Sequence, residues 1–72
     1  MTSREFRKCV FRTPFQPVRI TLDAGEPLEV RHPETIAIGP KMAVVMHDSG
    51  EVVLFEMARV VSVTYLKAKA RS

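Results

Sequence analysis

Two short segments of this chain place a histidine next to a carboxylate, a combination of residue types that often does chemistry. In the first segment His32 and Glu34 flank Pro33, and in the second His47 is followed directly by Asp48. A histidine oriented by a carboxylate is the arrangement of a general base. Two histidines and two carboxylates would also suffice as ligands for zinc or manganese. Structural roles explain both segments more simply. His32 could bond the backbone that Pro33 leaves unpaired, and an aspartate in a turn such as Asp48 commonly bonds nearby backbone groups.

We therefore expect no catalytic residue, no metal site and no cofactor. The spacing of the two histidine segments gives no sign that they meet, and the chain contains no phosphate-binding loop and no nucleophile–base order. Cys9 is the only cysteine, so an intrachain disulfide and the usual Cys/His zinc site are excluded. Its place beside Phe6 and Val10 on an apolar stripe indicates a buried structural thiol.

The basic residues are concentrated at the two ends of the chain. Residues 1–12 and residues 67–72 each carry a net charge of +3, whereas the segment between them carries −3. An anionic partner such as RNA would therefore contact the ends. So few charges per chain would bind nucleic acid weakly unless an oligomer multiplied them. The candidate nucleic-acid-binding residues are Arg4, Arg7, Lys8, Arg12, Lys67, Lys69 and Arg71.

A short helix is predicted within residues 1–13. Thr2 and Glu5 have the spacing of a capping box, in which each side chain bonds a backbone N–H of the other residue. The sequence Thr13-Pro14 ends the helix, because a residue before proline avoids helical backbone angles. Arg4, Lys8 and Arg12 would line the side opposite the apolar stripe.

The segment that follows is predicted to form short antiparallel strands. Apolar and polar residues alternate over 18–22 and again over 28–32, which is the period of a half-buried strand. Gly25 provides the turn between these two strands, and His32 falls in phase with the inward residues of the second. Pro33 has no backbone N–H, so we expect a bulge or a sharp bend there.

The predicted fold class is mainly β, in a single domain over residues 1–72. A short N-terminal helix over 1–13 precedes about five antiparallel strands over 14–66, followed by a basic tail over 67–72. The strands would form a small Sm-like or SH3-like barrel, or a strongly bent sheet.

The strands predicted after Gly39 are apolar on both faces, over 42–46, 52–55 and 60–66. Such strands need cover on both faces, and one short helix cannot cover three strands. We therefore expect a homo-oligomer. The candidate interface residues are Met42, Val45, Val53, Phe55 and Val60.

Two resemblances support this architecture. The segments Pro14–Gly25 and Val30–Glu34 resemble the patterns Pro-Phe-x-Pro-Phe/Val-x-Ile-x-Leu-x-x-Gly and Val-Arg-His-Pro-Glu of small uncharacterised bacterial proteins. More distantly, the chain resembles Sm-like barrels of the Hfq type, in the turn Leu22–Gly25, in the segment Ala58–Val63 and in the helix that precedes the barrel. The second resemblance implies a ring-forming fold that binds RNA, whereas the first implies no activity.

The sequence thus predicts a non-enzymatic binding or assembly module. One alternative is RNA binding through basic helix faces displayed on a homo-oligomer. The other is a structural or regulatory subunit that binds protein through an exposed strand edge. We expect no membrane contact, because no apolar run approaches the length of a membrane span. Charged residues interrupt any signal-peptide core, and with the single cysteine this predicts a cytoplasmic protein.

Overall fold

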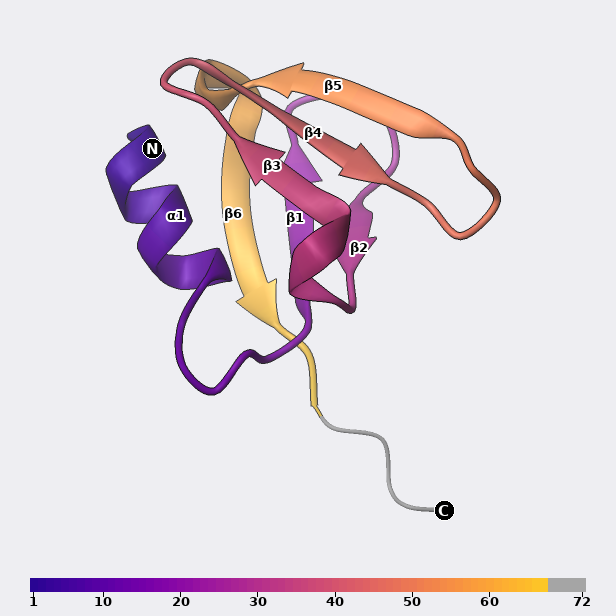
Figure 1. Ribbon diagram of the computed structural model, residues 1–72. Helices are drawn as coiled ribbons and strands as arrows, with labels where there is room; N and C mark the ends of the chain where they lie inside the picture. The colour runs from indigo at the N-terminus through magenta and orange to yellow at the C-terminus, as the bar shows by residue number, and fades with distance from the viewer. Residues whose placement is uncertain (68–72) are drawn as a thin grey trace.

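The computed structural model describes residues 1–67, in which one helix precedes six antiparallel strands (Figure 1). Helix α1 (Ser3–Val10) begins at the predicted capping box. The Glu5 N–H donates to Thr2 Oγ1 at 3.1 Å, and the Thr2 N–H donates to Glu5 Oε1 at 3.2 Å. The helix ends earlier than predicted, at the C-cap residue Phe11, whose N–H bonds the Arg7 carbonyl.

The strands form two sheets of three strands each. The first sheet has the order β2-β1-β6 and consists of β1 (Val18–Leu22), β2 (Leu28–Val30) and β6 (Val60–Tyr65). The second has the order β3-β4-β5 and consists of β3 (Ile36–Ile38), β4 (Met42–Met46) and β5 (Val52–Glu56). Figure 1 shows the second sheet crossing in front of the first. The fold is therefore mainly β, as predicted, but the described strands do not close into a barrel.

Strand pairing is interrupted at Pro33, which confirms the predicted bend. The interruption divides one predicted strand into β2 and β3, so the chain has six strands where about five were predicted. A 3-10 turn, η1 (Pro33–Thr35), separates β2 from β3. Since proline lacks the N–H that a strand ladder needs, pairing stops before it. The predicted inward position of His32 is wrong: its side chain is exposed, because the chain leaves the ladder after Val30.

Two glycines and a second 3-10 turn, η2 (Met57–Arg59), shape the remaining connections. Gly25 and Gly50 have φ values of +84° and +93°, where an L side chain would be strained. The η2 turn connects β5 of the second sheet to β6 of the first. It is held by the Asp23 N–H, which donates to the Arg59 carbonyl at 2.9 Å.

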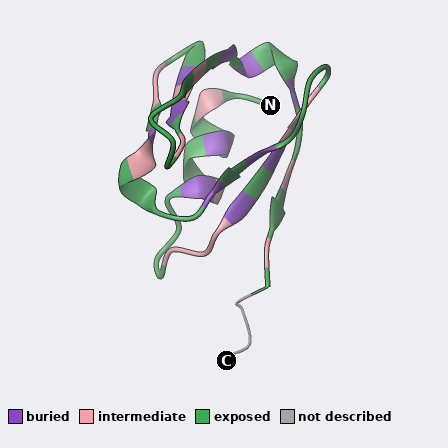
Figure 2. Cartoon of the chain, turned by 90° about the vertical axis from the view of Figure 1, so that its right-hand side faces the viewer, coloured by how far each residue is buried: buried purple, intermediate pink, exposed green. Residues whose placement is uncertain are grey.

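The hydrophobic core lies between the two sheets and α1. Figure 2 shows buried residues on α1 and on the strands that enclose it. Within residues 1–67 every buried side chain is apolar. The side chains with no exposed area are Phe6, Val10, Val18, Ile20, Val30 and Val45. None of the helices in this part of the chain has both the length and the hydropathy of a membrane span.

Candidate functional site

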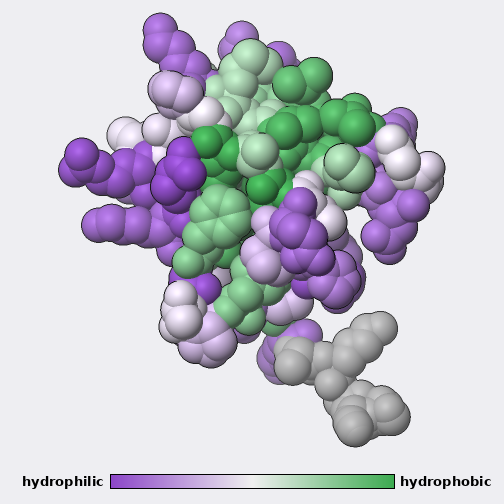
Figure 3. All heavy atoms as spheres, viewed as in Figure 1, coloured by the Kyte–Doolittle hydropathy of each residue, from purple (hydrophilic) through white to green (hydrophobic). Residues whose placement is uncertain are grey.

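The outer face of the second sheet carries a continuous group of apolar side chains. Strand register places Val44 between Ala37 of β3 and Leu54 of β5, and pairs Met46 with Val52. Leu54 is 66% exposed, Met46 55% and Val52 51%. Figure 3 shows these strands as a hydrophobic area facing the viewer. We call this group the apolar face; it consists of Ala37, Met42, Val44, Met46, Val52 and Leu54.

The apolar face is slightly hollowed near its β3 side. The hollow has a volume of about 310 Å³, and Met42, Val44 and Leu54 contribute to its lining, together with Ala37 and the end of β3. Such a surface offers hydrophobic contact and no group that titrates near neutral pH. It can therefore bind another apolar surface but supplies no acid, base or nucleophile.

The outer face of the first sheet is polar by contrast. Glu29 accepts hydrogen bonds from Arg19 at 3.2 Å and from Arg31 at 2.8 Å. These bonds, that from Arg19 first, hold the pKa of the Glu29 carboxyl below its ordinary value. The exposed Thr64 of β6 pairs with Arg19 of β1. The outer face of the first sheet is thus polar around Arg19 and Glu29, although β6 also exposes Val61, whereas the outer face of the second sheet is mainly apolar.

The predicted interface residues lie mostly elsewhere. Val45, Phe55 and Val60 are buried in the core of the chain itself, so their prediction as interface residues is wrong. Val53 is half-buried and packs against the same core. Of the five, only Met42 belongs to the apolar face. The error is one of phase, because a shift of one residue in a strand exchanges its two faces.

The residues of the apolar face that sequence reasoning missed are Ala37, Val44, Met46, Val52 and Leu54, of which Val44 is half-buried. A signal existed in β5, where Phe55 is the largest side chain and the natural choice for the core. Period two then puts Leu54 and Val52 outside. In β4 no comparable signal exists, because every position of both faces is occupied by alanine, valine or methionine.

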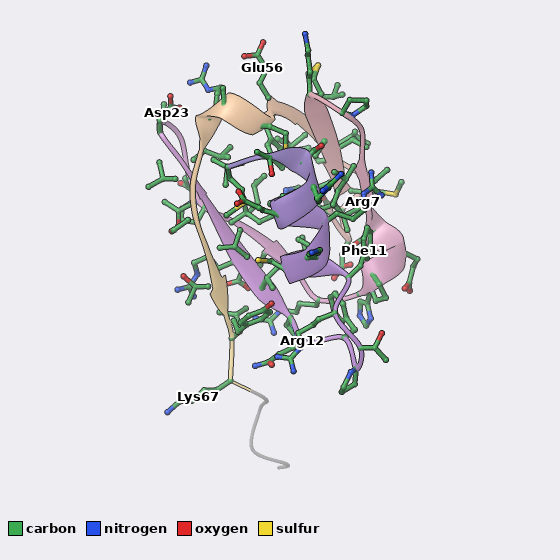
Figure 4. All side chains as sticks on the ribbon, turned by 90° about the vertical axis from the view of Figure 1, so that its left-hand side faces the viewer. Arg7, Phe11, Arg12, Asp23, Glu56 and Lys67 are labelled. Atoms are coloured by element: carbon green, nitrogen blue, oxygen red, sulfur yellow. The ribbon has the colours of Figure 1, made fainter. Side chains whose placement is uncertain are left out.

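Two of the predicted phosphate-binding arginines are engaged within the chain. The Arg7 guanidinium donates to the Ile38 carbonyl at 2.6 Å. Arg12 donates to Gln16 Oε1 at 2.9 Å and lies 5.2 Å from the centre of the Tyr65 ring. Figure 4 shows the Arg7 side chain extending from α1 and Arg12 below the helix. Arg12 also lies beyond the end of α1 and does not extend a helical row of charges.

The remaining predicted basic residues are scattered. Arg4 and Lys8 are exposed on α1 and form no ion pair within residues 1–67. Lys67 is exposed near the end of β6 (Figure 4). Lys69 and Arg71 lie outside the described residues.

The two histidine segments do come together. His32, His47 and Asp48 line one polar hollow of about 210 Å³, with Glu29 and Arg31 also in its wall. Glu34 does not line it. Among residues 1–67 no three His, Cys, Asp or Glu side chains are placed to hold a metal ion. The hollow therefore brings the candidate residues near each other without forming a metal site.

Cys9, expected to be buried, is half-buried, on the helix that carries Phe6 and Val10.

Comparisons of the chain with protein-family profiles, curated proteins and solved structures gave no match.

Proposed function

We propose that this protein is a non-enzymatic assembly module that associates with further copies of itself through the apolar face. The observation that carries the proposal is the exposure of Leu54, the largest aliphatic side chain at the middle of that face. A contiguous exposed apolar patch on a small protein is typical of an interaction site. Fully burying a leucine, methionine or valine side chain contributes about 1.5–3 kcal/mol.

The strand order supports a relationship to Sm-like barrels as part of this proposal. Only five residues separate β2 from β3: Arg31, His32 and the three residues of η1. When β2 and β3 are taken as one bent strand, the order runs continuously from β6 through β1 and β4 to β5. That order, with a helix before the first strand, agrees with the resemblance to small ring-forming barrels.

RNA binding is the second candidate function, and exposed charge favours it. Arg4 and Lys8 project from neighbouring turns of α1 without an acidic partner in the described part of the chain. Phosphate contacts of this kind supply affinity that depends on salt. Assembly would multiply the pair by the number of copies.

Light scattering coupled to size-exclusion chromatography tests the assembly. We expect a mass that is a multiple of 8.1 kDa at micromolar concentration. Leu54→Glu should restore the monomer, because a carboxylate would have to be buried in an apolar contact. Thr64→Glu is the matched control, since Thr64 is equally a strand residue on an outer face but lies on the polar sheet. A monomeric wild type at all concentrations would refute the proposal.

A further inference from the structure

The outer edge of β5, with which no strand of residues 1–67 pairs, is a second feature of the sheet that carries the apolar face. Two hydrogen bonds define the alternation along β5: the His47 N–H donates to the Glu51 carbonyl, and the Met57 N–H donates to the Lys41 carbonyl, both at 2.8 Å. Odd-numbered residues of β5 therefore bond to β4. The backbone N–H and C=O groups that point away from β4 belong to Val52, Leu54 and Glu56.

The outer edge of β3 already bonds to a side chain, that of Arg7. The Gly39 N–H donates to the Met42 carbonyl at 2.7 Å, so by alternation the Ile38 backbone groups point away from β4. The Ile38 carbonyl accepts the guanidinium of Arg7 at 2.6 Å. A strand arriving at this edge would have to displace that bond.

The two edges of the first sheet are less available than that of β5. Strand β2 has only three residues and is soon followed by Pro33, which lacks an N–H. Helix α1 lies alongside β6 in both Figure 1 and Figure 4. The Tyr65 hydroxyl of β6 donates to the Cys9 carbonyl of that helix at 2.8 Å.

Strand β5 also lacks the features that usually protect an edge. Natural edge strands avoid pairing by being short or by carrying lysine, proline or a bulge. Strand β5 has five residues, contains neither lysine nor proline, and pairs with β4 in unbroken register. Its one charge, Glu56, lies at its end.

We propose that β5 pairs with β5 of a second copy of this chain, antiparallel and about a twofold axis at Leu54. This inference rests on the proposed self-assembly and adds to it a backbone contact at the edge of the sheet that carries the apolar face. Leu54 would lie opposite Leu54 of the partner subunit, and Val52 opposite Glu56 of the partner subunit. Each opposed pair exchanges two backbone hydrogen bonds, so all the outward groups of the strand are satisfied.

A second copy fits this edge because the register is complementary to itself. A twofold contact requires the same surface to match its own rotated image. In this register Glu56 faces valine, so no like charges are directly opposed, which would be destabilising. Leu54 belongs to the edge and to the apolar face alike, so the pairing would join the apolar faces of the two copies into one surface.

Amide hydrogen exchange measured by NMR tests the proposal on the full chain. Spectra are recorded well below and well above the concentration at which light scattering shows association. Protection of the Val52, Leu54 and Glu56 amides should rise about tenfold or more with concentration, since the paired state is then favoured by mass action. The Val53 and Phe55 amides, already bonded to β4, serve as internal controls and should change far less.

A backbone variant gives an independent measurement. Val52→Pro removes one N–H that points away from β4 and keeps all the backbone hydrogen bonds between β4 and β5. Val52→Ala removes side-chain bulk but keeps that N–H. We expect Val52→Pro to weaken association about tenfold relative to Val52→Ala, with both variants folded by circular dichroism. If the proline variant does not fold, the exchange pattern of the wild type decides.

The outcomes separate this geometry from assembly itself. Association without added protection at Val52, Leu54 and Glu56 would overturn the β5 pairing and leave assembly through the apolar face intact. No association at any concentration would overturn both.

The outer edge of β6 offers a different pairing for β5. The Leu66 N–H donates to the Pro17 carbonyl, so by alternation the backbone N–H and C=O groups of Val63 and Tyr65 point away from β1. Concentration-dependent protection there would indicate head-to-tail pairing of β5 with β6 and would overturn the twofold axis.

Discussion

Phe6 of α1 packs edge-on against Phe55 of β5, with ring centroids 6.2 Å apart and ring planes at 87°. Both side chains are buried. The contact ties the helix to the second sheet and places Phe55 on the inner face of β5. Because side chains alternate along a strand, Leu54 must then face outward. The same contact that builds the core thus exposes the centre of the apolar face.

Phe6→Leu should lower the free energy of unfolding while leaving the fold intact. An edge-to-face aromatic pair contributes about 0.5–1.5 kcal/mol beyond the area it buries, and the smaller side chain leaves space in the core. Urea denaturation followed by circular dichroism measures the change. Phe11→Leu is the control, because Phe11 is an exposed cap residue and the same replacement should have little effect. Equal losses in the two variants would contradict this packing.

Val45→Ala and Val44→Ala test which face of β4 is inside. Val45 is fully buried, so Val45→Ala should cost about 1–3 kcal/mol of unfolding free energy. Val44 lies on the apolar face, and Val44→Ala should change the stability of the dilute protein by less than about 0.5 kcal/mol. The assembly proposal adds that Val44→Ala weakens association, measured by light scattering. A larger loss of stability for Val44→Ala would reverse the assigned faces.

Arg4→Glu/Lys8→Glu tests RNA binding through α1. If the helix contacts phosphate, fluorescence anisotropy with labelled single-stranded RNA should show affinity that falls steeply with salt, and the double variant should abolish it. Arg19→Glu/Arg31→Glu reverses the same charge on the polar sheet and serves as the control. Binding that is absent at low salt, or unaffected by the helix variant, would remove this candidate function.

The Glu29 carboxyl should titrate at a lower pH than an ordinary glutamate in the folded protein. The hydrogen bonds from Arg19 and then Arg31 lower its pKa. The folded state therefore binds this proton less tightly than the unfolded state. The resulting stabilisation is present above the unfolded pKa and is lost as the pH falls through the lowered folded pKa.

NMR titration of the Glu29 side-chain carbon measures that pKa directly. Arg19→Gln should raise the titration midpoint toward the ordinary value, since it removes the hydrogen bond that lowers the Glu29 pKa most. An unchanged midpoint would show that the Arg19 bond does not form in solution.

Elements governed by local rules could be predicted from the sequence. The capping box of Thr2 and Glu5 depends only on residues three apart, and it forms as predicted. The turn at Gly25 and the break at Pro33 follow from backbone preferences of single residues. The alternation over 18–22 identified Val18 and Ile20 as core residues, because polar neighbours marked the opposite face.

The candidate site depended on information that local patterns do not contain. Where both faces of a strand are apolar, alternation gives no phase, and only the contact of Phe55 with Phe6 selects the inner side. Likewise, His32 and His47 line one hollow because β3 pairs with β4 in a register that places the start of β3 beside the end of β4. The sequence by itself determined the helix cap, the turns and the amphipathic strands, because these follow from backbone preferences and period. Only the tertiary structure decided which apolar residues remain exposed, because that choice depends on packing between residues far apart in the chain.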